Sequence, residues 1–217
     1  PEASVKEYML TILNSNFEEW RKTNKTEDVS KFPFNLKKMS VSGALFDMVK
    51  FNDVSKNVIS VMTAKQVYKL VTDWAMDYNE VLYALFVDDK EKATAILNID
   101  RENPKPRKDI ACWEEVENYV SYFYNELYEA DYTLPEHISK TDAVEILTKY
   151  KEVYSADDSK EDWFNKIKEL CTACGYTPNV KEYKQNPDAF KGHVGDVSTV
   201  IRIAITSRTN TPDLYYI

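Results

Sequence analysis

Few side chains in this chain of 217 residues have the types and spacing that a catalytic or metal-binding site requires. Cys171 and Cys174 form a single Cys-x-x-Cys pair, and the chain has one further cysteine and two histidines. A structural zinc site needs four ligands at matching spacing, and neither Cys112 nor the histidines complete such a set. A thioredoxin-like site would need a preceding strand, which the pattern lacks. We therefore expect the pair to be buried thiols of a helix.

Motifs of other enzyme classes are also missing from the sequence. There is no Walker-type glycine loop, no His-Ile-Gly-His-like ATP motif, and no Ser/His/Asp or Cys/His set in a suitable context. His137 has no partner at ligand spacing, so a role at the surface or in a helix cap is expected. We expect no catalytic residue and no metal ligand, and no catalysis by this chain alone.

Cationic side chains are the remaining candidates for chemistry. The densest basic patch is residues 101–108, where Pro104 and Pro106 prevent a helix. Arg202 lies in an apolar run that leads into a polar loop. A guanidinium group can hydrogen-bond an unstacked base or stack on it, whereas the alternatives are a solvated connector for the patch and an internal salt bridge for Arg202. The net charge of −8 has the wrong sign for nucleic-acid binding, but a local basic face can coexist with it.

The composition is that of a globular chain with one or two domains. Hydrophobic residues make up 43% of the chain and charged residues 29%, which is enough to build a core. Only four glycines argue against a turn-rich β protein, and three cysteines, an odd number, indicate a reducing compartment. No apolar run approaches the roughly 18–20 residues that span a bilayer, and no secretory signal is visible.

Apolar residues recur at spacings of three and four along most of the chain, which predicts amphipathic helices. One helix begins at a capping box formed by Thr63 and Gln66, and another begins at Ser159 and ends at Gly175. The run 197–206 is an exception, because its β-branched composition alone favours a strand. Pro212 after it is suited to open a further helix. Helices are predicted over residues 1–13, 64–78, 80–86, 88–97, 113–127, 141–150 and 160–174.

Two stretches carry a resemblance to one family. Residues 191–214 resemble the end of bacterial glutamyl-tRNA synthetases, with a motif close to Gly-x-x-Pro/Val-Leu-Arg-Val-Ala-Leu-Thr-Gly, a small loop and Ser/Thr-Pro-x-Leu. Residues 40–51 resemble that family's stem-contact pattern, Ser-Lys-Ser-x-Ala-x-Phe-Asp/Asn-x-x-Lys-Leu. The overlapping Lys38-Met39-Ser40-Val41-Ser42 is similar to the Lys-Met-Ser-Lys-Ser loop of class I synthetases, but Val41 replaces the second lysine, so that interpretation is rejected. The resemblance covers essentially the whole chain.

The resemblance implies an all-α fold, a helical bundle in which a stem-contact segment precedes an α-helical cage of two subdomains that reads the anticodon. The implied domains are residues 1–60 (stem contact), 61–133 (first anticodon-binding subdomain) and 134–217 (second subdomain). It also implies that residues 197–206 are helical. The parent protein would be a class I glutamate–tRNA ligase that attaches glutamate to tRNA with ATP and magnesium. These would bind in an N-terminal catalytic domain outside this chain, and the chain itself would hold no cofactor.

The resemblance also implies site residues. Arg202, Thr211, Pro212 and Leu214 match positions that approach anticodon bases. Ser207 departs from the pattern, because the family usually has glycine there, so the backbone of the loop is expected to differ. Arg101 is the first candidate and Arg107 the second for a further anticodon-binding arginine. Lysines that we expect to contact phosphates of the tRNA stem are Lys37, Lys38 and Lys50.

The implied partner is tRNA(Glu), with tRNA(Gln) as a further candidate, and neither DNA nor a membrane is expected as a partner. We expect a cytoplasmic monomer. We also expect a piece of a longer protein, because the chain begins without methionine and ends where a helix should start. The alternative from another class is a helical protein–protein interaction module without RNA binding, suggested by acidic charge and abundant tyrosine and tryptophan. An internal repeat of about 33–45 residues would favour it, and none is found.

Overall fold

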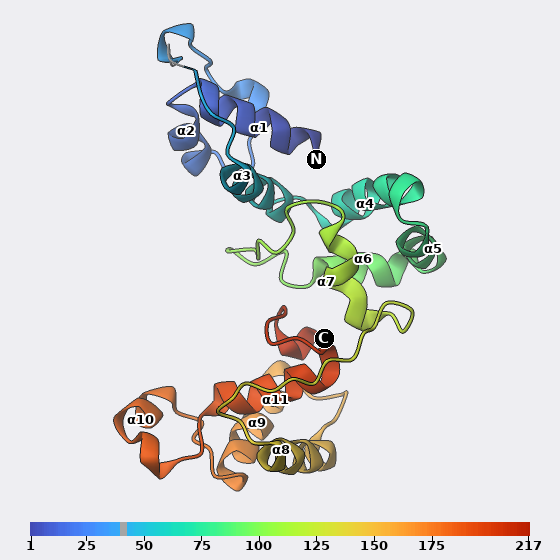
Figure 1. The fold of residues 1–217 in the computed structure, drawn as a ribbon, viewed down its shortest axis with the longest axis vertical. Helices are drawn as coiled ribbons and strands as arrows, with labels where there is room; N and C mark the ends of the chain where they lie inside the picture. The colour runs from blue at the N-terminus through green and yellow to red at the C-terminus, as the bar shows by residue number, and fades with distance from the viewer. Residues whose placement is uncertain (40–42) are drawn as a thin grey trace. The chain divides into compact units, whose positions relative to one another are not determined.

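The computed structural model describes residues 1–39 and 43–217, and this part of the chain is all-α (Figure 1). The chain divides into two compact units, Pro1–Leu127 and Tyr128–Ile217. No strand forms in the described residues, and one isolated bridge joins Thr177 and His193. The all-α prediction is therefore confirmed. The domain limits predicted at 60/61 and 133/134 concern functional parts and stay a prediction.

Unit 1 contains seven α-helices and three 3-10 helices among its described residues. They are α1 (Glu2–Leu13), α2 (Phe17–Thr23), η1 (Val29–Lys31), η2 (Leu36–Lys38), α3 (Met48–Ser60), α4 (Ala64–Tyr78), α5 (Glu80–Asp88), α6 (Lys90–Asn98), α7 (Glu115–Val120) and η3 (Ser121–Phe123).

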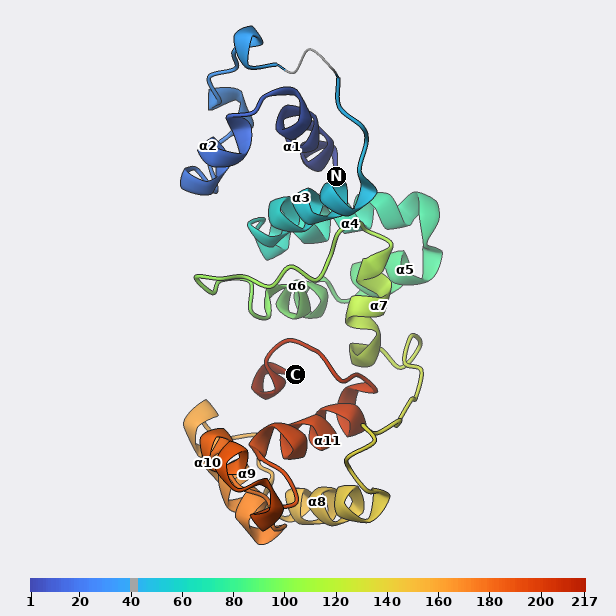
Figure 2. The same ribbon diagram turned by 60° about the vertical axis from the view of Figure 1, so that its left-hand side comes forward.

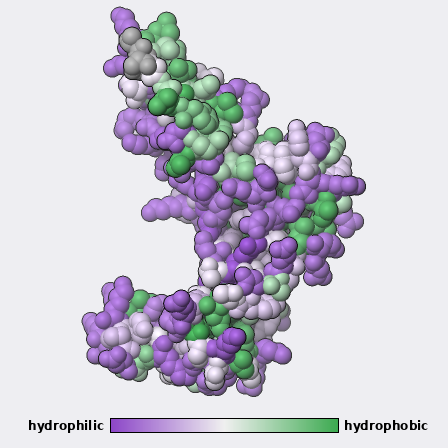
Figure 3. All heavy atoms as spheres, viewed as in Figure 1, coloured by the Kyte–Doolittle hydropathy of each residue, from purple (hydrophilic) through white to green (hydrophobic). Residues whose placement is uncertain are grey.

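The N-terminal part of unit 1 is a pairing of α1 with α3. Tyr8 is buried between them, and its hydroxyl accepts a hydrogen bond from the Asp47 backbone N–H at 2.6 Å. Asp47 caps α3 by accepting from the backbone N–H groups of Val49 and Lys50. Ser55 on α3 then donates to the Ala111 carbonyl at 2.5 Å, which ties α3 to the loop before α7. Apolar side chains remain exposed on this part of the unit, as Figure 3 shows in green, among them Leu36, Leu45 and Val49.

The second half of unit 1 packs α4, α5, α6 and α7 around one apolar core. The predicted capping box is present at the start of α4, where Thr63 and Gln66 satisfy each other's backbone N–H groups. Val67, Val71 and Ala75 of α4 are fully buried, at the spacing of four that an inward helix face requires. The predicted helix over 113–127 is shorter than expected, because α7 begins only at Glu115 and continues as η3.

Unit 2 is built on three longer helices, α8, α9 and α11, which pack against one another (Figures 1 and 2). Its elements are α8 (Lys140–Val153), α9 (Lys160–Ala173), α10 (Val180–Gln185), η4 (Pro187–Ala189), α11 (Val194–Thr206) and η5 (Leu214–Tyr216). Ser159 caps α9, and Gly175 follows its end with φ +80°, a conformation that glycine adopts without strain. Both signals were predicted from the sequence.

Residues 197–206 form helix α11, so their β-branched composition did not make a strand. Val197, Val200 and Ile201 are fully buried at helical spacing, which puts the branched side chains against the core of the unit. At the start of α11 the His193 ring accepts a hydrogen bond from the Gly195 N–H, and the Asp196 carboxylate accepts one from the His193 N–H. Packing and capping together outweigh the intrinsic preference of these residues.

The prediction that Pro212 opens a further helix is wrong. The next helix, η5, begins at Leu214 and is a 3-10 turn. Asp213 caps it by accepting a hydrogen bond from the Tyr215 backbone N–H at 3.1 Å. Because a carboxylate at the cap binds an otherwise unpaired N–H, the turn starts after Asp213 and leaves Pro212 in the loop.

The Cys-x-x-Cys pair is buried, as predicted. Cys171 lies on the inner face of α9 and Cys174 directly follows that helix. Burial raises the pKa of the Cys171 thiol from 9.0 to about 12 and also raises the pKa of Cys174. Both thiols therefore stay protonated and unreactive in the folded unit at neutral pH.

This burial predicts a loss of stability at alkaline pH. Above pH 9.0 the unfolded chain releases the Cys171 proton, whereas the folded unit holds it until about pH 12. The free energy of unfolding of unit 2 should therefore fall as pH rises through this window, by up to about 1.4 kcal/mol per pH unit for this thiol. Urea unfolding under reducing conditions, followed by the fluorescence of Trp163, measures the slope. Cys171→Ala should flatten the slope and Cys112→Ala, at an exposed thiol, should not. Equal slopes for wild type and Cys171→Ala would contradict the assignment.

Candidate nucleic-acid interface

Arg202 is fixed to the loop that follows its own helix. Its Nε donates a hydrogen bond to the Thr211 hydroxyl at 3.1 Å, across nine residues of sequence. The Thr211 hydroxyl in turn donates to the Pro212 carbonyl at 2.9 Å. Thr211 is buried while Arg202 is half-buried, so the guanidinium is held by a group inside the loop and reaches the surface of unit 2. A preoriented guanidinium of this kind loses less conformational entropy on binding than a mobile one.

The turn that ends α11 depends on Ser207. This residue has φ 55° and ψ 26°, the left-handed conformation in which glycine is normally found. Its hydroxyl lies 2.9 Å from the Tyr128 hydroxyl and accepts from the Asp131 backbone N–H at 2.9 Å. The loop backbone was expected to differ here, but Ser207 takes the conformation that glycine favours, and its side chain adds bonds that glycine could not make.

The other three matched positions face inward. Thr211, Pro212 and Leu214 are all buried, and Leu214 is part of the apolar core of unit 2. Their side chains therefore shape the loop from within. The residues that the loop exposes are Thr209 and Asn210. This pair was not predicted from the sequence, although the position between a helix end and a proline was a usable signal for an exposed loop tip.

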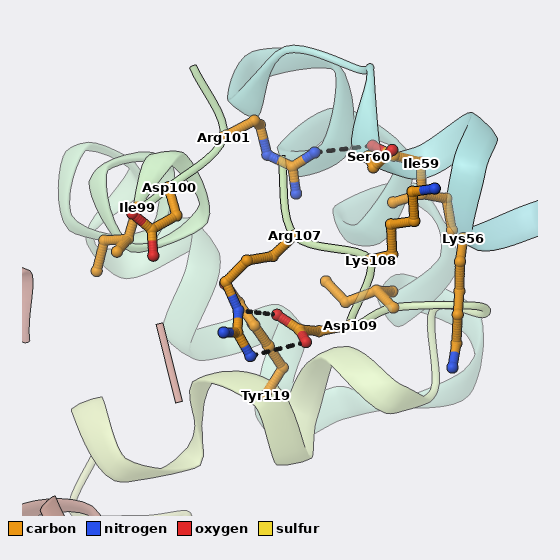
Figure 4. A pocket seen from close by; sticks show the side chains of 11 residues that line it. Lys56, Ile59, Ser60, Ile99, Asp100, Arg101, Arg107, Lys108, Asp109 and Tyr119 are labelled. Atoms are coloured by element: carbon orange, nitrogen blue, oxygen red, sulfur yellow. Dashed lines mark hydrogen bonds and ion pairs between the residues drawn. The ribbon is translucent and has the colours of Figure 1, made fainter. Parts of the chain in front are cut away.

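Arg101 and Arg107 come together in one pocket of unit 1 (Figure 4). The Arg101 guanidinium donates to the carbonyls of Leu97 and Ile59 at 2.8 Å each, and to that of Met62 at 3.1 Å. Burial lowers the pKa of the Arg101 guanidinium below its ordinary value. Three of its five N–H donors are thus used to join α3 and the linker after it to the end of α6.

Arg107 is held differently in the same pocket. It binds Asp109 through two hydrogen bonds, from Nε at 2.6 Å and from Nη2 at 2.9 Å, and this pairing raises the pKa of Arg107. Tyr119 of α7 lines the same wall, and burial raises the pKa of its hydroxyl to about 12, so the hydroxyl is neutral. The pocket also contains Lys108, which belongs to the basic patch 101–108, and Lys56, which was not predicted from the sequence.

The three lysines predicted to contact the tRNA stem lie in the N-terminal part of unit 1. Lys37 and Lys38 are exposed on η2. Lys50 on α3 forms an ion pair with Glu18 of α2. Ser40, Val41 and Ser42, which belong to the stem-contact pattern, are outside the described residues.

His137 lies at the surface, as predicted. The exposed His137 ring lies 3.0 Å from Asp196, the carboxylate at the start of α11. In the described ranges, no three His, Cys, Asp or Glu side chains are grouped so that they could hold a metal ion. None of the helices described is both long and apolar enough to span a bilayer.

Comparison with known proteins shows which proteins this chain is related to. No protein-family model matches it. Three curated relatives named glutamate–tRNA ligase are 46% identical over 215 residues (Acetivibrio thermocellus), 44% over 221 residues (Clostridium perfringens) and 41% over 216 residues (Sorangium cellulosum). These alignments cover 99–100% of this chain but only 38–40% of the relatives.

The names of the relatives put the chain among the tRNA ligases, the aminoacyl-tRNA synthetases. With its whole length aligned at such identity, the chain belongs to the glutamate–tRNA ligase family, and it spans about two fifths of the length of the relatives it matches.

The geometry at Ser207 predicts an order of stability for two variants. Ser207→Ala keeps the left-handed strain and removes both hydroxyl bonds, whereas Ser207→Gly removes the same bonds but relieves the strain. We expect the glycine variant to be more stable than the alanine variant by about 1 kcal/mol. The free energy of unfolding of unit 2, from urea denaturation, checks this. An alanine variant as stable as the glycine variant would mean that the turn at Ser207 changes conformation.

Proposed function

We propose that this chain is the C-terminal, tRNA-binding part of a glutamate–tRNA ligase, and that unit 2 reads the anticodon. The whole protein would attach glutamate to tRNA, with ATP and magnesium held outside this chain. The proposal is supported by the family relationship along the entire chain. It is further supported by the end of unit 2, where a half-buried guanidinium is oriented beside an exposed loop tip.

The single observation on which the anticodon assignment depends is the bond between Arg202 and Thr211. Proteins read RNA sequence mainly at unpaired bases, through stacking on planar groups and hydrogen bonds to base edges. An arginine provides both, if its plane is held in place. In this proposal Thr211 orients Arg202, while Pro212 and Leu214 hold the shape of the loop, and Thr209 and Asn210 face the RNA. The partner would be tRNA(Glu), with tRNA(Gln) as the second tRNA to test.

A binding experiment tests the assignment of Arg202. Arg202→Ala should weaken binding of tRNA(Glu) by about 1–3 kcal/mol and should reduce the preference over a tRNA with an exchanged anticodon. Filter binding with both tRNAs measures affinity and selectivity together. Thr211→Val, which keeps the cation but removes its hydrogen-bond acceptor, should reduce selectivity by a smaller amount. Lys151→Ala, which removes an exposed charge of α8, serves as the control.

Two outcomes would count against the proposed function. If Arg202→Ala kept both affinity and selectivity, Arg202 would be excluded from the site. If the wild-type chain bound no tRNA at any salt concentration, the alternative of a protein–protein interaction module would be favoured, because phosphate contacts give an affinity that rises steeply as salt is lowered.

A further inference from the structure

The pocket of unit 1 carries positive charge on a chain that is otherwise acidic. It is an open, shallow hollow between the end of α3, the loop after α6 and the face of α7, and its volume is about 310 Å³ when the solvent space at its mouth is included (Figure 4). Four cationic and two anionic side chains line it, whereas the whole chain has a net charge of −8. The cations are Lys56, Arg101, Arg107 and Lys108, and the anions are Asp100 and Asp109.

Both carboxylates of the pocket are already occupied by neighbours within the loop. Asp109 accepts two hydrogen bonds from Arg107. Asp100 accepts one from the Asn103 side chain at 3.0 Å, and its backbone is held in the left-handed region with φ 59°. The carboxylates therefore order the loop, and among the described residues neither forms an ion pair with Lys56 or Lys108.

The two arginines have a structural role in the pocket. Arg101 is fixed by three backbone carbonyls, and Arg107 by Asp109. They hold the loop of residues 101–108 in place and add positive potential, so we regard them as positioning residues. Apolar wall residues, including the buried Ile59 and Ile110, keep water from one side of the hollow and strengthen the field inside it.

Lys56 and Lys108 differ from the arginines, because neither ammonium group has an ion-pair or hydrogen-bond partner among the residues that the structure describes. Lys56 is half-buried on α3, and Lys108 is exposed on the loop. A lysine is a compact point charge on a flexible stem, and it is a common binder of phosphate. These two side chains can therefore turn towards an anion that lies across the pocket.

The size and openness of the hollow limit the class of ligand. Pockets that enclose a whole small molecule begin at about 300 Å³ and bury most of its surface. This hollow is shallow and open to solvent and encloses far less space than that, so it suits a segment that passes over it. A nucleic-acid backbone fits this description, because its phosphates repeat along the chain and need no deep cavity.

We propose that the pocket of unit 1 is a binding site for the sugar–phosphate backbone of RNA, with Lys56 and Lys108 as the phosphate-contacting groups. This inference rests on the proposed function, because tRNA would supply the backbone. It adds a contact that is independent of base identity and separate from the lysines predicted from sequence. An acidic protein segment is the other ligand that the charge would attract, and the experiment separates the two.

The test compares Lys56→Gln, Lys108→Gln and the double variant with Lys65→Gln, which removes an exposed charge of α4 outside the pocket. Affinity for tRNA(Glu) is measured between about 50 and about 200 mM salt. Each pocket variant should lose about fivefold in affinity at low salt. Each should also make the dependence of log K on log salt less steep by about one, and the double variant by about two. Because phosphates carry no base identity, a tRNA with an exchanged anticodon should lose the same factor.

Three results would overturn the inference. Pocket variants that behave like Lys65→Gln, while Arg202→Ala still weakens binding, would remove the pocket from the interface and leave the proposed function standing. A wild-type chain that binds no tRNA would refute the proposed function and this inference with it. Binding of a poly-glutamate peptide that requires Lys56 and Lys108, with tRNA binding unchanged in the double variant, would identify the ligand as an acidic protein segment. The free energy of unfolding of each variant is measured as a control. Where it equals that of the wild type, a weaker affinity reflects a lost contact with the ligand and not a loss of folded protein.

Discussion

The left-handed turn at Ser207 is the constraint on which the far end of unit 2 depends. It stops α11 at Thr206 and reverses the chain, so that the Thr211 hydroxyl reaches Nε of Arg202. The buried face of α11 fixes where that turn occurs, because Val200 and Ile201 must stay in the core. One strained residue thus determines both the position of the loop and the orientation of its arginine. The cost of the strain is of order 1 kcal/mol, which two hydroxyl bonds can offset.

Units 1 and 2 use arginine in contrasting ways. Arg101 donates three N–H groups to backbone carbonyls of α3, of the linker after α3 and of α6, which makes it part of the fold. Arg202 instead donates a hydrogen bond to the Thr211 hydroxyl of the loop after α11, and its half-buried side chain reaches the surface of unit 2. Residue type and sequence position did not distinguish these cases. The distinction depends on which backbone carbonyls lie near each guanidinium, and that is a property of tertiary structure.

Much of the fold was predictable because the apolar spacing and the caps agree with each other, as at Thr63 and Ser159. Residues 197–206 could not be assigned from composition, since β-branched residues favour strands in general but fill the inner face of α11 here. The burial of Thr211, Pro212 and Leu214 was not predictable either, because short polar loops are usually exposed. Lys56 was missed for a simpler reason: it lies about fifty residues before Lys108, and only folding brings the two to one pocket.

The buried thiols of unit 2 have a practical consequence for observing the molecule. Cys171 and Cys174 are sealed in the apolar interior, whereas Cys112 in unit 1 is exposed. An alkylating reagent would therefore modify Cys112 at once and the other two only when unit 2 opens. Mass spectrometry of a labelling time course would count these events separately, so the native chain already carries its own reporter of local opening, without any introduced probe.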